Sequence, residues 1–302
     1  MSGPPSDDVT ARRDGHRSDA RGQLSESDEQ RQAIVLAALT LLVLVSGAAV
    51  GAVWLLVATA LLQAGLILSW AFGTGMPGRN GALIIGAGSA IGADVAVSVY
   101  PHRGLAPLLI VLGLAVPVMF VHQLARGVVR TRTTESLSKV ALLVVAVTGA
   151  AAFPQLRHEF DGAKMATAAT LTVAAAVLVA HVGDRLWSRP RFDPEVARGL
   201  FGVVAGTVVG GACGLVLLKD VDGFGLARAA WVAPVMAAVA ALLSVGAGFI
   251  VHGLPETHPA DPTTDAGPYH EGDPSLLPVV SVLLPLALSA PVAYLLCIAG
   301  HG

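Results

Sequence analysis

Long apolar runs alternate with short polar segments along this chain. The first run, residues 33–72, contains no Asp, Glu, Lys, Arg or His over 40 residues. About 20 apolar residues form a helix that crosses the ~30 Å hydrocarbon core of a bilayer, so this run holds two spans. The same pattern repeats along the sequence, in runs too long and too uniformly apolar for spanning β-strands. It predicts an all-α, polytopic transmembrane helical bundle of about nine spans: 33–50, 52–73, 81–100, 104–125, 138–156, 165–187, 199–218, 226–251 and 276–299.

The composition is typical of a membrane protein and not of a soluble domain or a nucleic-acid-binding protein. Hydrophobic residues make up 54% of the chain and charged residues 13%, whereas soluble domains carry about 25% charged residues. The net charge is −2, and no basic cluster is dense enough to follow a phosphate backbone, so nucleic acid is excluded as a partner. We expect a multi-pass protein of the cell (plasma) membrane with membrane lipids as partners; a protein partner or a homo-oligomer stays open.

The positions of the basic residues predict the orientation. With nine spans and a cytoplasmic N-terminus, 14 of the 19 Lys and Arg fall on the cytoplasmic side and five on the outer side. This asymmetry follows the positive-inside rule and predicts an outer C-terminus. The outer five are Arg103, Arg157, Lys164, Lys219 and Arg228.

The chain divides into a polar tail and a membrane domain. Residues 1–32 carry five Arg and seven Asp or Glu with almost no large apolar side chain, so we expect a disordered cytoplasmic tail. Acidic residues crowd the region where a signal peptide would be basic. Ser27 and Gln30 have capping-box spacing and predict a helix start. Residues 33–302 then form the transmembrane domain.

Two glycine patterns predict close helix packing. Gly202, Gly206, Gly210 and Gly214 recur every four residues, a glycine-zipper spacing that places them on one face of the seventh span. The segment 86–92 imitates a dinucleotide-binding turn. That motif needs a strand, a turn and a soluble βαβ unit, whereas these glycines lie within a span. We therefore interpret Gly88 and Gly92 as helix-packing positions.

Asp94 is the one carboxylate deep within a predicted span. A charge at such a position costs ~3 kcal/mol, so the side chain should face the bundle interior or titrate. Two interpretations carry equal weight: a proton or cation site, or a hydrogen-bonded Asp near the end of its helix.

A second polar group lies at the end of the sixth span. His181 and Asp184 are three residues apart and share a helix face. The basic residues Arg185, Arg189, Arg191 and Arg198 follow and are candidates to bind lipid or phosphate. The carboxylate would either hold a divalent cation for an anionic substrate or form a surface Asp–Arg pair beside a surface His, which we favour.

Other polar positions predict no site. Loop 252–275 contains no Lys or Arg, and its histidines lack metal-binding spacing, so we interpret it as a solvated linker. Cys213 and Cys297 lie within spans without CxxC spacing and are interpreted as packing residues. Whether a metal binds anywhere is left open by the sequence.

The order of Asp184, the basic loop 185–198 and the glycine-rich stretch Gly202–Gly214 resembles that in phosphatidate cytidylyltransferases (CDP-diacylglycerol synthases). Spans four to nine carry this resemblance, and Pro291 in the last span is similar to the family's ending. It implies a transferase acting on an anionic lipid head group, with Mg²⁺ on Asp184. The family's His-Gly-Gly, Asp-Arg-x-Asp and Lys-Thr-x-Glu-Gly elements are absent, which makes the chain similar to a degenerate relative.

Three functions follow as hypotheses. The absence of a complete catalytic set favours a non-enzymatic membrane protein that acts as a scaffold, accessory subunit or lipid-associated partner, with no cofactor. The first alternative is the cytidylyltransferase-like transferase, which alone would require Mg²⁺. The second is a transporter with Asp94 as its coupling site, although no inverted repeat is evident.

Overall fold

The computed structural model describes residues 7–75, 78–125, 133–187, 189–191, 198–252 and 272–301, with side chains from Asp28 onward except those of Ala125, Thr133, Glu135 and His252. Every regular element within these ranges is a helix, and one isolated bridge joins Arg191 to Gly199. The elements are α1 (Asp7–Val50), α2 (Ala52–Gly73), α3 (Arg79–Val99), α4 (Ala106–Ala125), α5 (Thr133–Ala150), α6 (Ala152–Leu156), α7 (Gly162–Leu186), α8 (Leu200–Leu218), α9 (Gly225–His252), the 3₁₀ turn η1 (Pro274–Leu276) and α10 (Leu277–His301).

The predicted all-α bundle is confirmed. Within the described residues, nine helical segments are long and apolar enough to cross a membrane. Their bounds differ from the predicted spans by a few residues at most ends, and the fifth span consists of α5 followed directly by the short α6. Helices satisfy all their backbone hydrogen bonds internally, which is what a hydrocarbon environment demands.

The first helix differs from the prediction. It begins at Asp7, well before the predicted start, so Ser27 lies inside the helix and does not cap it. Only Asp28–Val50 is apolar enough to span a membrane. The apolar span supplies the nucleus that an isolated charged peptide lacks.

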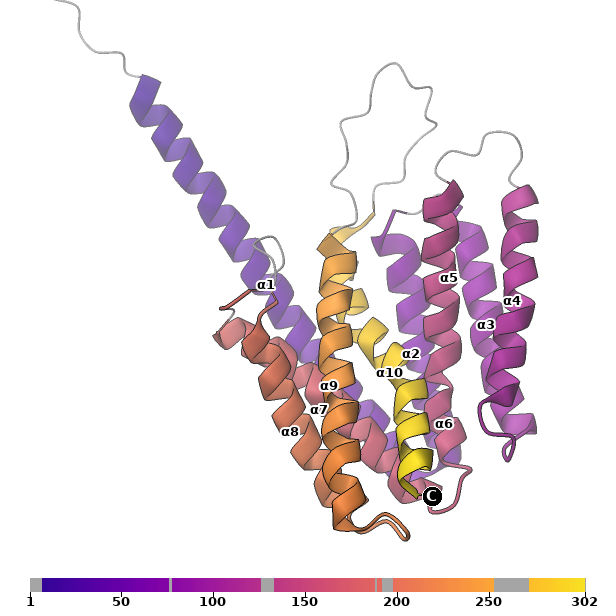
Figure 1. Ribbon diagram of the computed structural model, residues 1–302. Helices are drawn as coiled ribbons and strands as arrows, with labels where there is room; N and C mark the ends of the chain where they lie inside the picture. Colours follow the sequence, from indigo (N-terminus) through magenta and orange to yellow (C-terminus); the bar gives the residue numbers. More distant parts are fainter. Residues whose placement is uncertain are drawn as a thin grey trace, which may run out of the picture.

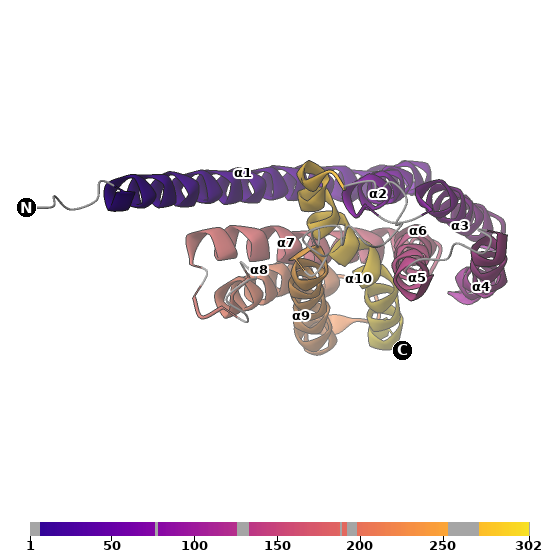
Figure 2. The same ribbon diagram turned by 90° about the horizontal axis from the view of Figure 1, so that it is seen from above.

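Helix α7 occupies the centre of one half of the bundle. It packs against α1, α8, α9 and α10, and the view from above places it between α1 and the α8–α9 pair (Figure 2). In an apolar stretch of 18 residues within Gly162–Leu186, 72% of the residues are buried, against 28% in the corresponding stretch of α8, which faces the surroundings. Helix α4 packs mainly on α3 and α5 at the far edge of the bundle (Figure 1).

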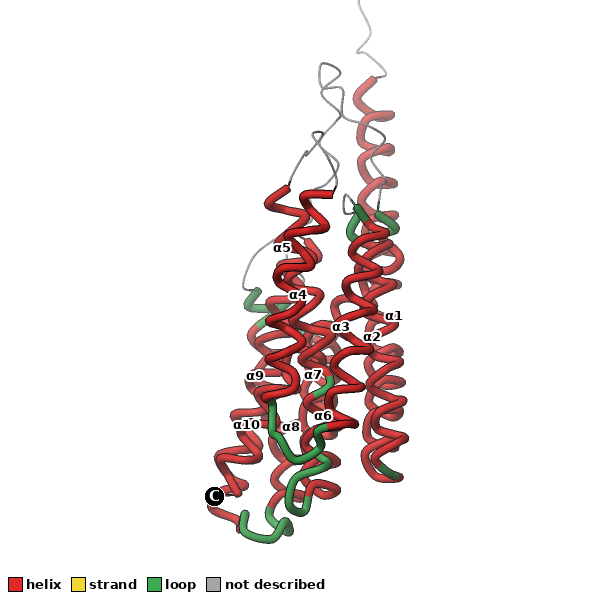
Figure 3. Tube along the Cα trace, turned by 90° about the vertical axis from the view of Figure 1, so that its right-hand side faces the viewer, coloured by secondary structure: helices red, strands yellow, loops and turns green. Residues whose placement is uncertain are grey.

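The helices run alongside one another, so their connections gather at two ends (Figure 3). Because the described spans are odd in number, the start of α1 and the C-terminus lie at opposite ends (Figure 1). The end that carries the start of α1 also holds Arg79, Lys139 and the end of α7. We call this the N-side end and the opposite one the C-side end.

Glycines bring the backbones of α7 and α8 into close contact. A Cβ added at Gly206 would lie 2.6 Å from the carbonyl oxygen of Ala176, and one at Gly210 would lie 2.8 Å from that of Thr172. Gly202 meets the carbonyl oxygen of Ala180 in the same way, whereas Gly214 faces the side chains of Thr172 in α7 and Ala233 in α9. A side chain at Gly202, Gly206 or Gly210 would force the two helices apart.

Gly88 and Gly92 in α3 do not make the close helix contacts that we inferred from their spacing. Gly88 has nothing within 4 Å of an added Cβ, and Gly92 meets only ordinary contacts with Val111. The close approaches in α3 are instead at Gly81, where a Cβ would collide with the His122 ring, and at Gly86, where a Cβ would lie 3.1 Å from Leu143. Packing at Gly88 was therefore predicted wrongly, because spacing alone does not say which face of a helix meets a neighbour.

The glycine contact gives a paired prediction. Gly206→Ala should destabilise the protein by about 1–3 kcal/mol, because the new methyl group meets a backbone oxygen that cannot move aside. Gly88→Ala, a matched control in open space, should leave stability unchanged or raise it. Thermal unfolding of the purified protein in detergent measures both; equal melting temperatures for the two variants would contradict the contact.

The orientation remains a prediction with a direct test. Alkaline phosphatase fused after His301 should be active, because this reporter works only outside the cytoplasm and the C-terminus is expected there. Green fluorescent protein fused at the same residue should stay dark. A bright fusion after His301 would reverse the layout.

Candidate functional site at the corner of α7 and α8

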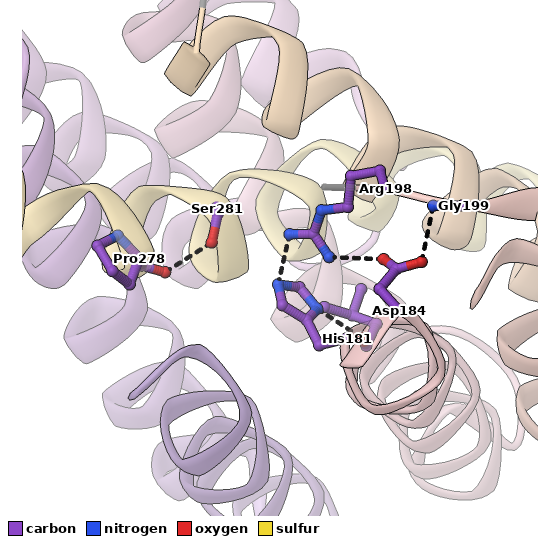
Figure 4. A network of polar contacts seen from close by, with 7 residues as sticks. His181, Asp184, Arg198, Gly199, Pro278 and Ser281 are labelled. Carbon is purple, nitrogen blue, oxygen red and sulfur yellow. Dashed lines mark hydrogen bonds and ion pairs between the residues drawn. The ribbon is translucent and has the colours of Figure 1, made fainter. Parts of the chain in front are cut away.

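The last turns of α7 and the start of α8 share a closed polar network (Figure 4). Arg198 donates from Nη1 to Asp184 Oδ2 at 3.1 Å, and its Nη2 lies 2.8 Å from His181 Nε2. The backbone N–H of Gly199 donates to Asp184 Oδ1 at 2.9 Å. Both carboxylate oxygens of Asp184 are therefore engaged, one by a guanidinium and one by the N-cap residue of α8.

The partners of His181 define its tautomer. Its Nδ1 lies 2.8 Å from the carbonyl oxygen of Val177, which can only accept a hydrogen bond. Its Nε2 lies against Arg198, which can only donate. The hydrogen therefore belongs on Nδ1 and Nε2 is the acceptor, so the ring is neutral. His181 acts here as a hydrogen-bonded link between α7 and Arg198.

All three side chains are buried, and the predicted surface ion pair is wrong in this respect. His181 and Asp184 are each 5% exposed and Arg198 is 9% exposed. A buried ion pair must offset the loss of solvation of both charges, which requires that its remaining polar groups be paired as well. Arg198, a candidate for binding phosphate, is thus engaged within the protein.

The glycine contact explains why the network can close. An added Cβ at Gly202 would collide with Asp184 Oδ1 and lie 2.7 Å from the carbonyl oxygen of Ala180. The start of α8 is also held by a hydrogen bond from the backbone N–H of Leu200 to the carbonyl oxygen of Pro190. The absence of a side chain at Gly202 lets the Asp184 carboxylate reach the first turn of α8, where the helix dipole favours a negative charge.

A small cavity of about 170 Å³ lies beside the network, between α1, α7, α9 and α10. Its polar lining combines the network with Gln30 of α1 and Ser281 of α10, whose hydroxyl donates to the carbonyl oxygen of Pro278 (Figure 4). Its remaining lining residues are Glu29, Ala33, Gly248, Val251 and Leu277. The buried charges thus border a space of only a few water molecules.

The outer side of the same corner is exposed and amphipathic. Arg185, Arg189 and Arg191 are exposed, unlike Arg198. An open groove of about 840 Å³ runs beside them, and Trp187, 64% exposed, packs against Phe201 with ring centroids 5.8 Å apart. The groove is lined by Trp187, Arg189, Pro190, Arg191, Leu200, Phe201 and Val204.

Asp94 belongs to a different part of the molecule. It lies near the C-side end of α3, whereas Asp184 lies at the N-side end of α7. Its hydrogen-bond partner is Gln63 of α2. The two intramembrane carboxylates therefore do not share a cavity, and the arginines of the α7–α8 corner gather with Asp184 alone.

Three further predictions concern the two cysteines, a metal site and the polar loops. Cys213 and Cys297 are free thiols. In the described part of the chain, no three His, Cys, Asp or Glu side chains gather as metal ligands. Most of loop 252–275, including His258 and His270, lies outside the described residues, as do residues 192–197 of the basic loop.

Sequence reasoning missed two polar partners. Gln63 is the one amide side chain in its span, and a lone amide in an apolar helix was the sequence signal that could have indicated a polar partner. Tyr294 donates a 2.6 Å hydrogen bond to Glu159 and ties α10 to the loop before α7. A tyrosine inside an apolar span gave no indication of its partner.

No protein-family model matches this chain, and no curated protein matches it. The site must therefore be interpreted from its own chemistry.

The ion pair yields a quantitative prediction. Asp184→Asn leaves the Arg198 guanidinium buried without a counter-charge and should cost about 3–5 kcal/mol. The double variant Asp184→Asn/Arg198→Met should lose less than the sum of the two single variants. Denaturant or thermal unfolding in detergent measures these differences.

A surface pair supplies the control for this experiment. Lys219 and Asp220 form an exposed 2.9 Å ion pair, so Asp220→Asn should cost less than about 1 kcal/mol. If Asp184→Asn were as mild as Asp220→Asn, the network would not hold the corner together.

Proposed function

We propose that this chain is a non-enzymatic, lipid-associated protein of the cell membrane, and that the corner of α7 and α8 binds the head group of an anionic phospholipid. One observation carries the proposal. The groove at this corner combines an apolar wall from α8 with Arg189 and Arg191 beside the helix end. This combination matches a molecule with a charged phosphate at one end and acyl chains at the other.

The individual residues suit those two parts of a phospholipid. Exposed Leu200, Phe201 and Val204 offer a surface for acyl chains, and the exposed Arg189 and Arg191 offer charges for a phosphate. Trp187 has the amphipathic ring typical of membrane–water interfaces. Each arginine near an anionic leaflet contributes about 1 kcal/mol.

The transferase alternative fits the site less well. It requires Asp184 to hold Mg²⁺, but both of its carboxylate oxygens already accept hydrogen bonds, from Arg198 and Gly199. A metal would have to displace the guanidinium, which would leave Arg198 buried and unpaired. The resemblance to phosphatidate cytidylyltransferases stays a hypothesis; nucleotide-dependent turnover by the purified protein would support it and contradict a non-enzymatic role.

Lipid binding is testable with the exposed arginines. Arg189→Gln/Arg191→Gln should weaken preferential binding of phosphatidylglycerol over phosphatidylcholine by about 10–30-fold, since two contacts of about 1 kcal/mol are lost. Native mass spectrometry of the protein released from mixed-lipid nanodiscs measures the preference. Added salt should weaken it in the unaltered protein, because the attraction is electrostatic.

Two basic residues at the opposite end serve as a charge-matched control. Arg103→Gln/Lys219→Gln removes the same number of charges from exposed positions at the C-side end, so the lipid preference should remain. If both double variants kept the preference, the α7–α8 corner would not be the binding site.

A further inference from the structure

Asp94 is held inside the membrane domain by an amide. Gln63 of α2 donates from Nε2 to Asp94 Oδ1 at 3.2 Å and to the carbonyl oxygen of Val147 in α5 at 2.9 Å. Gln63 is 2% exposed, and Asp94 is partly buried. Three helices, α2, α3 and α5, therefore meet at one polar point away from the α7–α8 corner.

The Gln63 amide can donate a hydrogen bond to the Asp94 carboxyl group whether that group is ionised or neutral. Both partners of Gln63 are acceptors, so its nitrogen, rather than its oxygen, must face them. A carboxylate and the carbonyl oxygen of a neutral carboxylic acid both accept such a bond. The position of Asp94 therefore does not depend on its charge, and the group can gain or lose a proton without rearrangement of the helices.

No opposite charge compensates Asp94 within the described residues. Gln63 is the one polar group of the described chain that acts on this carboxyl. Helix α3 packs on α2, α4 and α5, and α2 contains no Asp, Glu, Lys, Arg or His. The titratable residues of α4 and α5 are His122, Glu135 and Lys139, all toward the N-side end; those of the C-side loops nearest in sequence are Tyr100, His102, Arg103, Arg157, His158 and Glu159.

Lys139 and His122 are positioned away from Asp94. Lys139 reaches the carbonyl oxygen of Thr74 beyond the end of α2, and the ring of His122 lies against Gly81 in the first turn of α3. Both contacts are at the N-side end, whereas Asp94 lies about 8 Å from the C-side end of α3. An ionised carboxylate with a single amide donor is poorly stabilised in hydrocarbon.

Two buried hydroxyls lie on the helices that hold this group. Thr59 precedes Gln63 by one turn of α2, and Thr148 follows Val147 in α5. Both are fully buried, and neither hydroxyl has a hydrogen-bond partner among the described residues. Buried hydroxyls normally have a partner, so these two add hydrogen-bonding capacity to the helices beside the carboxyl group.

We propose that Asp94 is a proton-binding site within the membrane, with Gln63 as its positioning residue. The proton adds to the carboxylate oxygen that Gln63 does not contact, and the carboxyl group becomes neutral. Proton exchange takes place from the C-side end, to which Asp94 is closer. This site is independent of the proposed lipid contact at the α7–α8 corner.

Infrared difference spectroscopy of the full chain in nanodiscs tests the proposal. A pH step should produce a protonated-carboxyl band that shifts on ¹³C labelling of aspartate, and Asp94→Asn should remove it. Asp220→Asn, a matched change at an exposed aspartate, should leave it in place. Gln63→Leu should keep the band but move its titration midpoint by about one pH unit, because the amide bonds both forms of the carboxyl group but bonds the ionised form more strongly.

The outcomes distinguish a proton site at Asp94 from a different carboxyl group and from a metal-cation site. A labelled-carboxyl band that survives Asp94→Asn in a monodisperse, helical sample would overturn the proposal. Loss of the band on addition of sodium at constant pH would assign the site to a metal cation and overturn it as well. Should Asp94→Asn fail to fold, Gln63→Leu decides the matter, since an unchanged midpoint contradicts the role of Gln63 at the carboxyl group.

Discussion

The close backbone contact between α7 and α8 determines what the polar residues at their corner can do. Lipid tails are as apolar as leucine side chains, so helices in a bilayer gain little from burying apolar surface and depend on close packing and polar contacts. The glycines of α8 allow that packing, and Gly202 admits the Asp184 carboxylate to the first turn of α8. Asp184 then engages Gly199 and Arg198, the two residues directly before α8.

This arrangement gives the basic loop two distinct chemical parts. Arg198 is turned inward, where it neutralises Asp184 and contacts His181. Arg189 and Arg191 remain exposed beside the apolar face of α8. The inward arginine holds the corner together, and the outward ones make it a surface suited to anionic lipid. Different arginines of this one basic loop therefore have different roles. Arg198 stabilises the corner, and Arg189 and Arg191 form the proposed lipid contact.

Hydropathy was sufficient to predict the helical class and the spans, because a chain in hydrocarbon must satisfy its backbone within each helix. It did not predict that α1 extends into the charged tail, since that stretch lacks an apolar face and its helicity depends on the span that follows. Packing at Gly88 was predicted wrongly for a related reason: glycine spacing shows which residues share a face, not which helix lies opposite.

The polar partners were harder to predict than the helices. A pair between Asp184 and a nearby arginine was expected at the surface, but the arginine is 14 positions away and the pair is buried. Gln63 and Asp94 are 31 positions apart and meet only because α2 and α3 pack together. Such contacts depend on the arrangement of the helices, which hydrophobic periodicity does not specify. The two polar sites, at Asp94 and at Asp184, lie at opposite ends of the bundle.

The protonation of His181 tests most directly whether the α7–α8 network is closed. Solid-state ¹⁵N NMR of the histidine-labelled protein in lipid, assigned with a His181→Gln variant, distinguishes the two ring nitrogens. The account predicts a neutral ring with hydrogen on Nδ1 and an unprotonated Nε2, unchanged between about pH 5 and 8, because Val177 and Arg198 fix both nitrogens. A doubly protonated ring, or a hydrogen on Nε2, would contradict the contact with Arg198 and with it the closed network.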